Sequence, residues 1–233
     1  ALRAYIELNF NGPRDTIVEL LAGGICPVNT RTFSNDMTSF QSKDDILTLL
    51  IHLGYLGYDE KNSSVFIPNY EITSEFVNAV DGAGWGEVVS AIRQSMELLE
   101  AAWQKNSQKV ADLLEEQHMD HTSILSYNNE NALACTLALA YYSARVYYTM
   151  IRELPAGKGF ADLVFIPRQN HLDCPAMIVE LKWDYSAAGA IDQIKQKKYL
   201  RALRDFKGKL LLIGINYDQK TKQHTCIIEE SSC

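Results

Sequence analysis

The segment MIVELKWDY, residues 177–185, places a glutamate and a lysine two positions apart inside an apolar run. Because successive side chains of an extended strand point to opposite faces, Glu180 and Lys182 share one face and Leu181 points to the other. A buried charge costs free energy unless it has a partner or a function. The segment therefore predicts a core strand whose two charged side chains have a specific task.

A second strand-like segment, GFADLVFIP at residues 159–167, precedes this one and is separated from it by a polar loop. Pro167 and Pro175 bracket the loop. If the two segments pair symmetrically about its centre, Asp162 lies opposite Glu180. Opposed side chains of an antiparallel pair share a face and lie about 4.5–5.5 Å apart at Cβ. We therefore expect Asp162, Glu180 and Lys182 to form one cluster.

This cluster suggests a divalent cation. Two opposed carboxylates repel each other unless a positive charge lies between them. Mg²⁺ prefers hard oxygen ligands, commonly one or two carboxylates completed by water and substrate phosphate. An adjacent lysine suits a phosphate oxygen or an attacking water, so the set predicts a site that hydrolyses phosphodiester bonds. The alternative is a structural salt-bridge cluster, since acid-x-Lys is a common tripeptide.

Composition narrows the class of protein. The 233 residues carry a net charge of −7, which argues against non-specific coating of nucleic acid. Five cysteines, none of them in a C-x-x-C pair, argue against a zinc site or disulfide scaffold and favour a reducing cytoplasm. No stretch approaches the roughly 20 apolar residues of a membrane span, and the N-terminal residues lack the pattern of a signal peptide.

The two halves of the chain differ in pattern. Residues 1–120 read as mostly helical, with one helix that begins after Ser42 and a predicted hairpin, GYLGYDEKNSSVFIPN at residues 54–69. This order is typical of a winged-helix-like region, although the acidic hairpin favours a structural or domain-docking role over phosphate binding. Residues 121–233 read as α-β-β-α-β-β, with residues 128–154 expected to form one long apolar helix.

Three segments, GFADLVF, VELK and QIKQKKY, follow one another in an order that resembles the PD-(D/E)xK nuclease superfamily. The closest resemblance is to the nuclease domain at the C-terminus of bacterial AAA-ATPase-like proteins. It implies a restriction-endonuclease-like α/β domain over residues 121–233, a mixed sheet flanked by helices with an α-β-β-β-α-β core. That core needs one more strand than we predict, and residues 155–159 are the candidate. No G-x-x-x-x-G-K-[ST] loop occurs, so we expect the ATPase domain to be missing from this chain.

The resemblance also implies roles for individual residues. Asp162 and Glu180 would bind Mg²⁺ or Mn²⁺, with the backbone carbonyl of Leu181 as a further ligand. Lys182 would hold the attacking water or stabilise charge on phosphorus. Glu130 maps to the glutamate of the first core helix and would also bind metal. Its alternative role is a helix N-terminal acid that favours the helix dipole.

A basic helix follows the predicted site. The resemblance implies that Gln193 belongs to the site, and on a helical wheel it shares a face with Lys197, Arg201 and Arg204. That face would lie along a phosphate backbone, or would simply be the solvated side of an amphipathic helix.

Together these features predict a metal-dependent nuclease, with DNA as the expected substrate. Double-strand cleavage would favour a homodimer. One alternative is a catalytically silent nuclease-fold module that binds nucleic acid or a partner ATPase domain. Another is a helical adaptor whose function resides in residues 1–120.

Overall fold

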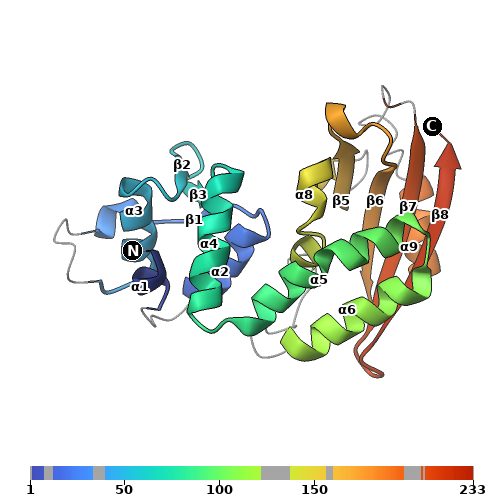
Figure 1. The fold of residues 1–233 in the computed structure, drawn as a ribbon, viewed down its shortest axis with the longest axis horizontal. Coiled ribbons are helices and arrows are strands. Elements are labelled where there is room, and N and C mark those ends of the chain that lie inside the picture. The colour runs from blue at the N-terminus through green and yellow to red at the C-terminus, as the bar shows by residue number, and fades with distance from the viewer. Residues whose placement is uncertain are drawn as a thin grey trace. The chain divides into compact units, whose positions relative to one another are not determined.

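The structure is a computed structural model that describes residues 2–7, 13–33, 40–121, 137–155, 160–196, 206 and 208–232. The chain divides into two compact units, Ala1–Ser90 and Ala91–Cys233 (Figure 1). Helix α5 (Gly86–Trp103) begins just before this division. The functional boundary predicted at residue 120 stays a prediction.

The first unit contains short helices and a small sheet. Its helices are α1 (Leu2–Ile6), α2 (Pro13–Leu21), the 3-10 helix η1 (Thr30–Thr32), α3 (Lys43–His52) and α4 (Tyr70–Gly82). Its strands are β1 (Cys26–Pro27), β2 (Gly57–Asp59) and β3 (Ser64–Phe66), in the spatial order β1-β3-β2.

Helix α3 begins and ends where its sequence indicates. The Ser42 hydroxyl accepts a hydrogen bond from Asp45 N (3.3 Å), and the Asp45 carboxylate accepts one from Ser42 N (3.0 Å). This capping box satisfies backbone donors that the first turn leaves without helical partners. At the other end Gly54 takes a left-handed φ of 81°, and Tyr55 N donates to Leu50 O. The predicted start after Ser42 is confirmed.

The predicted hairpin is also present. Strands β2 and β3 pair antiparallel, with Tyr58 opposite Val65, and β1 adds a third strand that the sequence did not predict. The turn is held by Asp59, whose carboxylate accepts hydrogen bonds from Lys61 N (3.0 Å) and Asn62 Nδ2 (2.7 Å). The Asp59 carboxylate therefore stabilises the turn between β2 and β3.

The second unit is a five-stranded mixed sheet flanked by helices, an arrangement consistent with a restriction-endonuclease-like fold. Its strands lie in the order β4-β5-β6-β7-β8, with β6 and β7 parallel and the other neighbours antiparallel. The strands are β4 (Tyr148–Pro155), β5 (Phe160–Pro167), β6 (Ala176–Trp183), β7 (Lys209–Asp218) and β8 (Gln223–Ser232). The remaining described elements are α6 (Ser107–His121), α8 (Ala144–Tyr147), η2 (Gln169–His171) and α9 (Ala187–Gln196).

Strand β4 takes the place of the last part of the helix predicted for residues 128–154. Residues 148–155, expected as the end of a long helix, form an edge strand that pairs antiparallel with β5. Their apolar residues fit both a helical and an alternating period, so the pattern alone did not separate the two. The strand ends at Pro155, the first residue of the segment 155–159 proposed for it, and residues 156–159 lie outside the described residues. With β4 in place, β4-β5-β6-α9-β7 supplies the expected run of three strands, helix and strand.

Helix α9 packs on one face of the sheet. Val164, Ile178 and Leu212 are neighbours across β5, β6 and β7, and they form an apolar cluster with Ile191 and Ile194 of α9. Each of these buried side chains contributes roughly 1.5–3 kcal/mol relative to exposure. In Figure 1, α5 and α6 lie in front of the sheet and α9 lies behind it.

The opposite face is rich in aromatic side chains. Tyr141 and Tyr148 both contact Phe165 of β5, with ring centroids 5.2 and 5.8 Å away. The indole of Trp103, at the end of α5, donates a hydrogen bond to the Tyr148 hydroxyl (2.7 Å). These contacts join α5 to the sheet.

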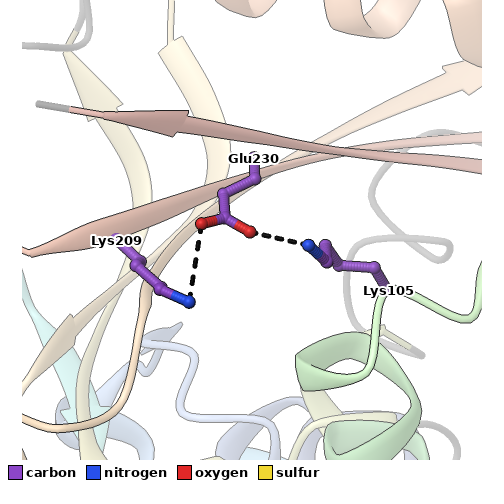
Figure 2. A network of polar contacts seen from close by, with 3 residues as sticks. All are labelled: Lys105, Lys209 and Glu230. Atoms are coloured by element: carbon purple, nitrogen blue, oxygen red, sulfur yellow. Dashed lines mark hydrogen bonds and ion pairs between the residues drawn. The ribbon is translucent and has the colours of Figure 1, made fainter.

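Helix α6 lies along the edge strand β8. Ser107 Oγ accepts a hydrogen bond from Ile228 N (3.1 Å), and Glu115 accepts one from His224 N (3.4 Å). Figure 2 shows the end of this edge, where the Glu230 carboxylate contacts two ammonium groups. Lys105 lies 2.7 Å and Lys209 3.7 Å from it.

Within the described part of the chain, none of the helices is both long enough and apolar enough to cross a membrane. The described cysteines, Cys26, Cys174 and Cys226, are not joined in disulfides.

Candidate active site

The site is positioned by the pairing of β5 with β6. Leu163 lies opposite Val179 and Val164 opposite Ile178, which is the register that the loop between the two strands predicts. Extended by one residue, this register sets position 162 against Glu180. The structure describes the backbone of Asp162 as part of β5, whereas its side chain lies outside the description.

Glu180 and Lys182 form the described centre of the site. The Glu180 side chain is 2% exposed and the Lys182 side chain 19% exposed, and Lys182 Nζ lies 3.4 Å from Glu180 Oε1. A carboxylate this deeply buried is costly unless it is compensated, and the ammonium provides part of that compensation. The pair therefore presents a positive group that reaches solvent beside a buried negative one.

Gly214 brings helix α9 close to this pair. It is the β7 partner of Glu180, so a side chain at 214 would share the face of Glu180. A Cβ at 214 would collide with the carbonyl oxygen of Ala187 and lie 3.0 Å from Ile191 Cγ1. Glycine is thus required for the first turn of α9 to rest on the sheet next to Glu180.

Asn216 fixes the loop that follows β6. It is the β7 partner of Lys182, it is buried, and its Oδ1 accepts a hydrogen bond from Tyr185 N (2.9 Å). Asp184 takes a left-handed φ of 51°, with its N–H bonded to Tyr217 O (2.8 Å) and its Oδ1 to Gln219 N (2.7 Å). The exit from β6 is therefore held at three points to β7 and the turn after it.

The other face of the same strand ends is aromatic. Trp183 and His224 both pack against Tyr217, with ring centroids 4.8 and 5.0 Å away. Burial, and then the charges of Asp184 and Asp218, raise the pKa of the Tyr217 hydroxyl. The charged pair Glu180–Lys182 thus has an aromatic layer behind it.

Residues 128–226 match the family model of the PD-(D/E)XK nuclease superfamily. No curated protein matches the chain. The match covers less than half of the chain, but it includes most of the five-stranded sheet and the strand positions of Asp162, Glu180 and Lys182. This part of the chain is similar to PD-(D/E)XK nucleases, which suggests a nuclease-type phosphodiesterase; the link to AAA-ATPase-like proteins stays a prediction.

A PD-(D/E)XK site needs acids that can hold a cation. In the part of the chain that the structure describes, no group of three or more His, Cys, Asp or Glu side chains could hold a metal ion. That part supplies Glu180, a hard oxygen donor of the kind that Mg²⁺ prefers. By register, the strand position of Asp162 lies beside that of Glu180, in one row across the sheet. The position of Glu153 in β4 lies next in this row, because Arg152 pairs with Leu163 and Leu154 with Ala161. The residue types in this row fit a divalent cation.

The structure describes only some of the remaining residues that the sequence predicts for the site. The Leu181 side chain is fully buried on the aromatic face. Gln193 is half-buried on α9, and the described contacts do not join it to Glu180 or Lys182. Glu130 and the basic residues of the helical face lie outside the described residues; the latter are Lys197, Arg201 and Arg204.

Sequence reasoning missed Gly214 and Asn216. A signal for both exists in KLLLIGINY, residues 209–217, where a glycine and a polar side chain interrupt an apolar strand. These two residues act through contacts with β6 and α9, so their structural roles can be interpreted only once the strand pairing is known.

Proposed function

We propose that this chain is a metal-dependent nuclease that hydrolyses phosphodiester bonds of DNA. The observation that carries the proposal is the buried Glu180, paired with Lys182 and set by register opposite the strand position of Asp162. These residues lie within the segment that matches the superfamily.

In this mechanism Asp162 and Glu180 would hold Mg²⁺ or Mn²⁺, with the carbonyl of Leu181 and the carboxylate of Glu130 as further ligands. When bound, such a cation lowers the pKa of water and neutralises charge on the phosphate. Lys182 has three N–H donors, so its contact with Glu180 leaves donors for the attacking water or a phosphate oxygen. Gln193 would help to position the substrate, and Lys197, Arg201 and Arg204 would contact its backbone.

The test is cleavage of DNA and RNA, each single- and double-stranded, with Mg²⁺ or Mn²⁺. We expect Lys182→Ala and Asp162→Asn each to lower the rate by about 10²-fold or more, the size of effect typical for lost transition-state stabilisation. Lys105→Ala is the matched control, because its ammonium contacts Glu230 at the sheet edge. EDTA should abolish cleavage. If the wild type and Lys182→Ala act alike on every nucleic acid, the enzyme proposal fails.

A second candidate is a catalytically silent module that binds nucleic acid or a partner ATPase domain. The net charge of −7 favours the form of this candidate that binds a partner ATPase domain, because an acidic protein attracts DNA weakly. Calorimetry with Mn²⁺ separates the two candidates. An active site should bind Mn²⁺ in a manner that Asp162→Asn removes, whereas a silent module should show no such binding.

The remaining proposals concern the role of the first unit and the source, assembly and location of the protein. The helices and three-stranded sheet of the first unit support a winged-helix-like region that docks other domains. An upstream AAA-ATPase-like domain, a bacterial source, a homodimer and a cytoplasmic location are proposals of the same kind.

A further inference from the structure

Tyr185, in the loop between β6 and α9, has an unusually open side chain. The residue is 71% exposed, the largest value among the large hydrophobic residues that the structure describes. Burying such a ring would release apolar surface from water, so leaving it open forgoes stabilisation. The open ring is available to a binding partner.

The exposed ring does not belong to a loose loop. Tyr185 N donates to Asn216 Oδ1 (2.9 Å), and the preceding Asp184 is bonded through both N and Oδ1 to the end of β7 and the turn beyond. Ser186 then caps α9, its Oγ accepting a hydrogen bond from Gly189 N (3.0 Å). The backbone on both sides of the ring is therefore fixed.

The ring itself rests against the helix through one edge. A Cβ at Gly189 would collide with Cε1 and lie 2.6 Å from Cδ1 of Tyr185. Glycine at 189 thus makes room for this edge, while most of the residue stays open to solvent. A ring whose backbone is already fixed loses less conformational entropy on binding.

The loop that carries the ring is anchored beside the charged pair. Asn216, which binds the Tyr185 backbone, is the direct β7 partner of Lys182, and both belong to the face that carries α9. A strand whose phosphate contacts Lys182 would therefore bring a neighbouring base toward the Tyr185 ring.

We propose that Tyr185 is a stacking platform for an unpaired base adjacent to the phosphate bound at Lys182, so that the site takes single-stranded or locally unpaired nucleic acid. The inference rests on the proposed function and specifies its substrate class. Stacking on an aromatic side chain tolerates any base, because every base has a π-face. A base inside a duplex already stacks on its neighbours and would have to be unstacked first.

Binding separates this role from a merely structural one. Anisotropy of a labelled single-stranded oligonucleotide, and of its duplex, is measured in EDTA with the full chain. We expect Tyr185→Leu to weaken single-strand binding by about 10-fold and duplex binding by less than about 2-fold. Tyr185→Phe should restore single-strand binding to within about 2-fold of wild type. Tyr70→Leu, a similarly exposed tyrosine at 60%, is the matched control and should change neither.

Several results would overturn the proposal. Equal weakening of both substrates by Tyr185→Leu, no weakening of either, or a Tyr185→Phe variant as weak as Tyr185→Leu would each do so. If Tyr185→Leu does not fold, Tyr185→Trp replaces it; the larger ring should strengthen single-strand binding, and unchanged binding would refute stacking.

The two proposals fail separately. If the wild type cleaves nothing with Mg²⁺ or Mn²⁺ but the single-strand preference depends on the ring at 185, the nuclease proposal fails and the platform stands. If the wild type cleaves and Tyr185→Leu binds and cleaves both substrates normally, the platform is refuted and the nuclease stands.

Discussion

Two of the acid–lysine contacts described in the second unit differ in an instructive way. At the edge of the sheet, Glu230 lies only 2.7 Å from Lys105, but the side chains are 35% and 47% exposed. In the centre, Glu180 and Lys182 are 3.4 Å apart, with side chains 2% and 19% exposed. The shorter contact lies in water, where an ion pair competes with hydration, and the longer one has lost most of its hydration. Burial, rather than distance, separates the pair at the proposed site from the contact at the edge.

The largest expected effect comes from breaking the central pair. Lys182→Ala leaves the Glu180 carboxylate buried without its ammonium, which should lower the free energy of unfolding by about 2–3 kcal/mol. This is below the range for fully buried pairs because Lys182 reaches solvent. Guanidinium unfolding measures it.

The double variant Glu180→Leu/Lys182→Met sharpens the same point. Replacing both charges with apolar groups should recover most of that stability while leaving no cleavage activity. A double variant less stable than Lys182→Ala would show that the pair itself, rather than the loss of the ammonium beside a buried carboxylate, determines stability.

The next effect concerns the helix that covers the central pair. Gly214→Ala forces the first turn of α9 away from the sheet, at an expected cost of about 1–3 kcal/mol from overpacking, together with reduced cleavage. Gly86→Ala is its control, because a Cβ there meets nothing within 4 Å. Equal unfolding midpoints for the two variants would contradict the close approach of α9.

A smaller effect is expected for the loop beside the pair. Asn216→Ala removes the acceptor for Tyr185 N and should lower stability by about 1 kcal/mol. Because it frees the loop, it should also reduce the preference for single-stranded over duplex DNA in the anisotropy measurement. A preference unchanged in Asn216→Ala would mean that the ring does not depend on this anchor.

The smallest effect belongs to the edge contact. Hydrogen bonding and charge from Lys105, followed by the charge of Lys209, lower the pKa of Glu230. A carboxyl group with a depressed folded-state pKa contributes stability above its ordinary pKa, and this contribution is lost as pH falls through the folded value. Lys105→Ala should therefore lower the thermal midpoint slightly at neutral pH, and less in acid or high salt. A loss that persisted in acid would indicate packing rather than charge.

Parts of this site could be predicted from the sequence because they depend on patterns within short segments of the chain. Two prolines centre the loop between β5 and β6, and that alone predicts the register that sets position 162 against Glu180. The alternation of charged and apolar residues in MIVELKWDY likewise predicts which side chains share a face. These features need no knowledge of the rest of the fold.

Other parts depend on partners distant in the chain. Residues 148–155 satisfy a helical and a strand period equally well, and pairing with β5 decides between them. A glycine is required at 214 only because the carbonyl oxygen of Ala187 lies where a Cβ would be. Similarly, the sequence of α6 does not indicate that Ser107 and Glu115 contact β8. Such features follow from tertiary contacts that a single sequence does not specify.

The position of α6 limits how this protein can assemble. Outer strands of open sheets can recruit a strand from another molecule through their outward backbone groups. At β8 the amides of 224 and 228 are already occupied by Glu115 and Ser107, so an incoming strand would have to displace them. Extension of the sheet at β8, into a fibril or a strand-swapped dimer, is therefore disfavoured. A homodimer of this protein would have to form through a different surface.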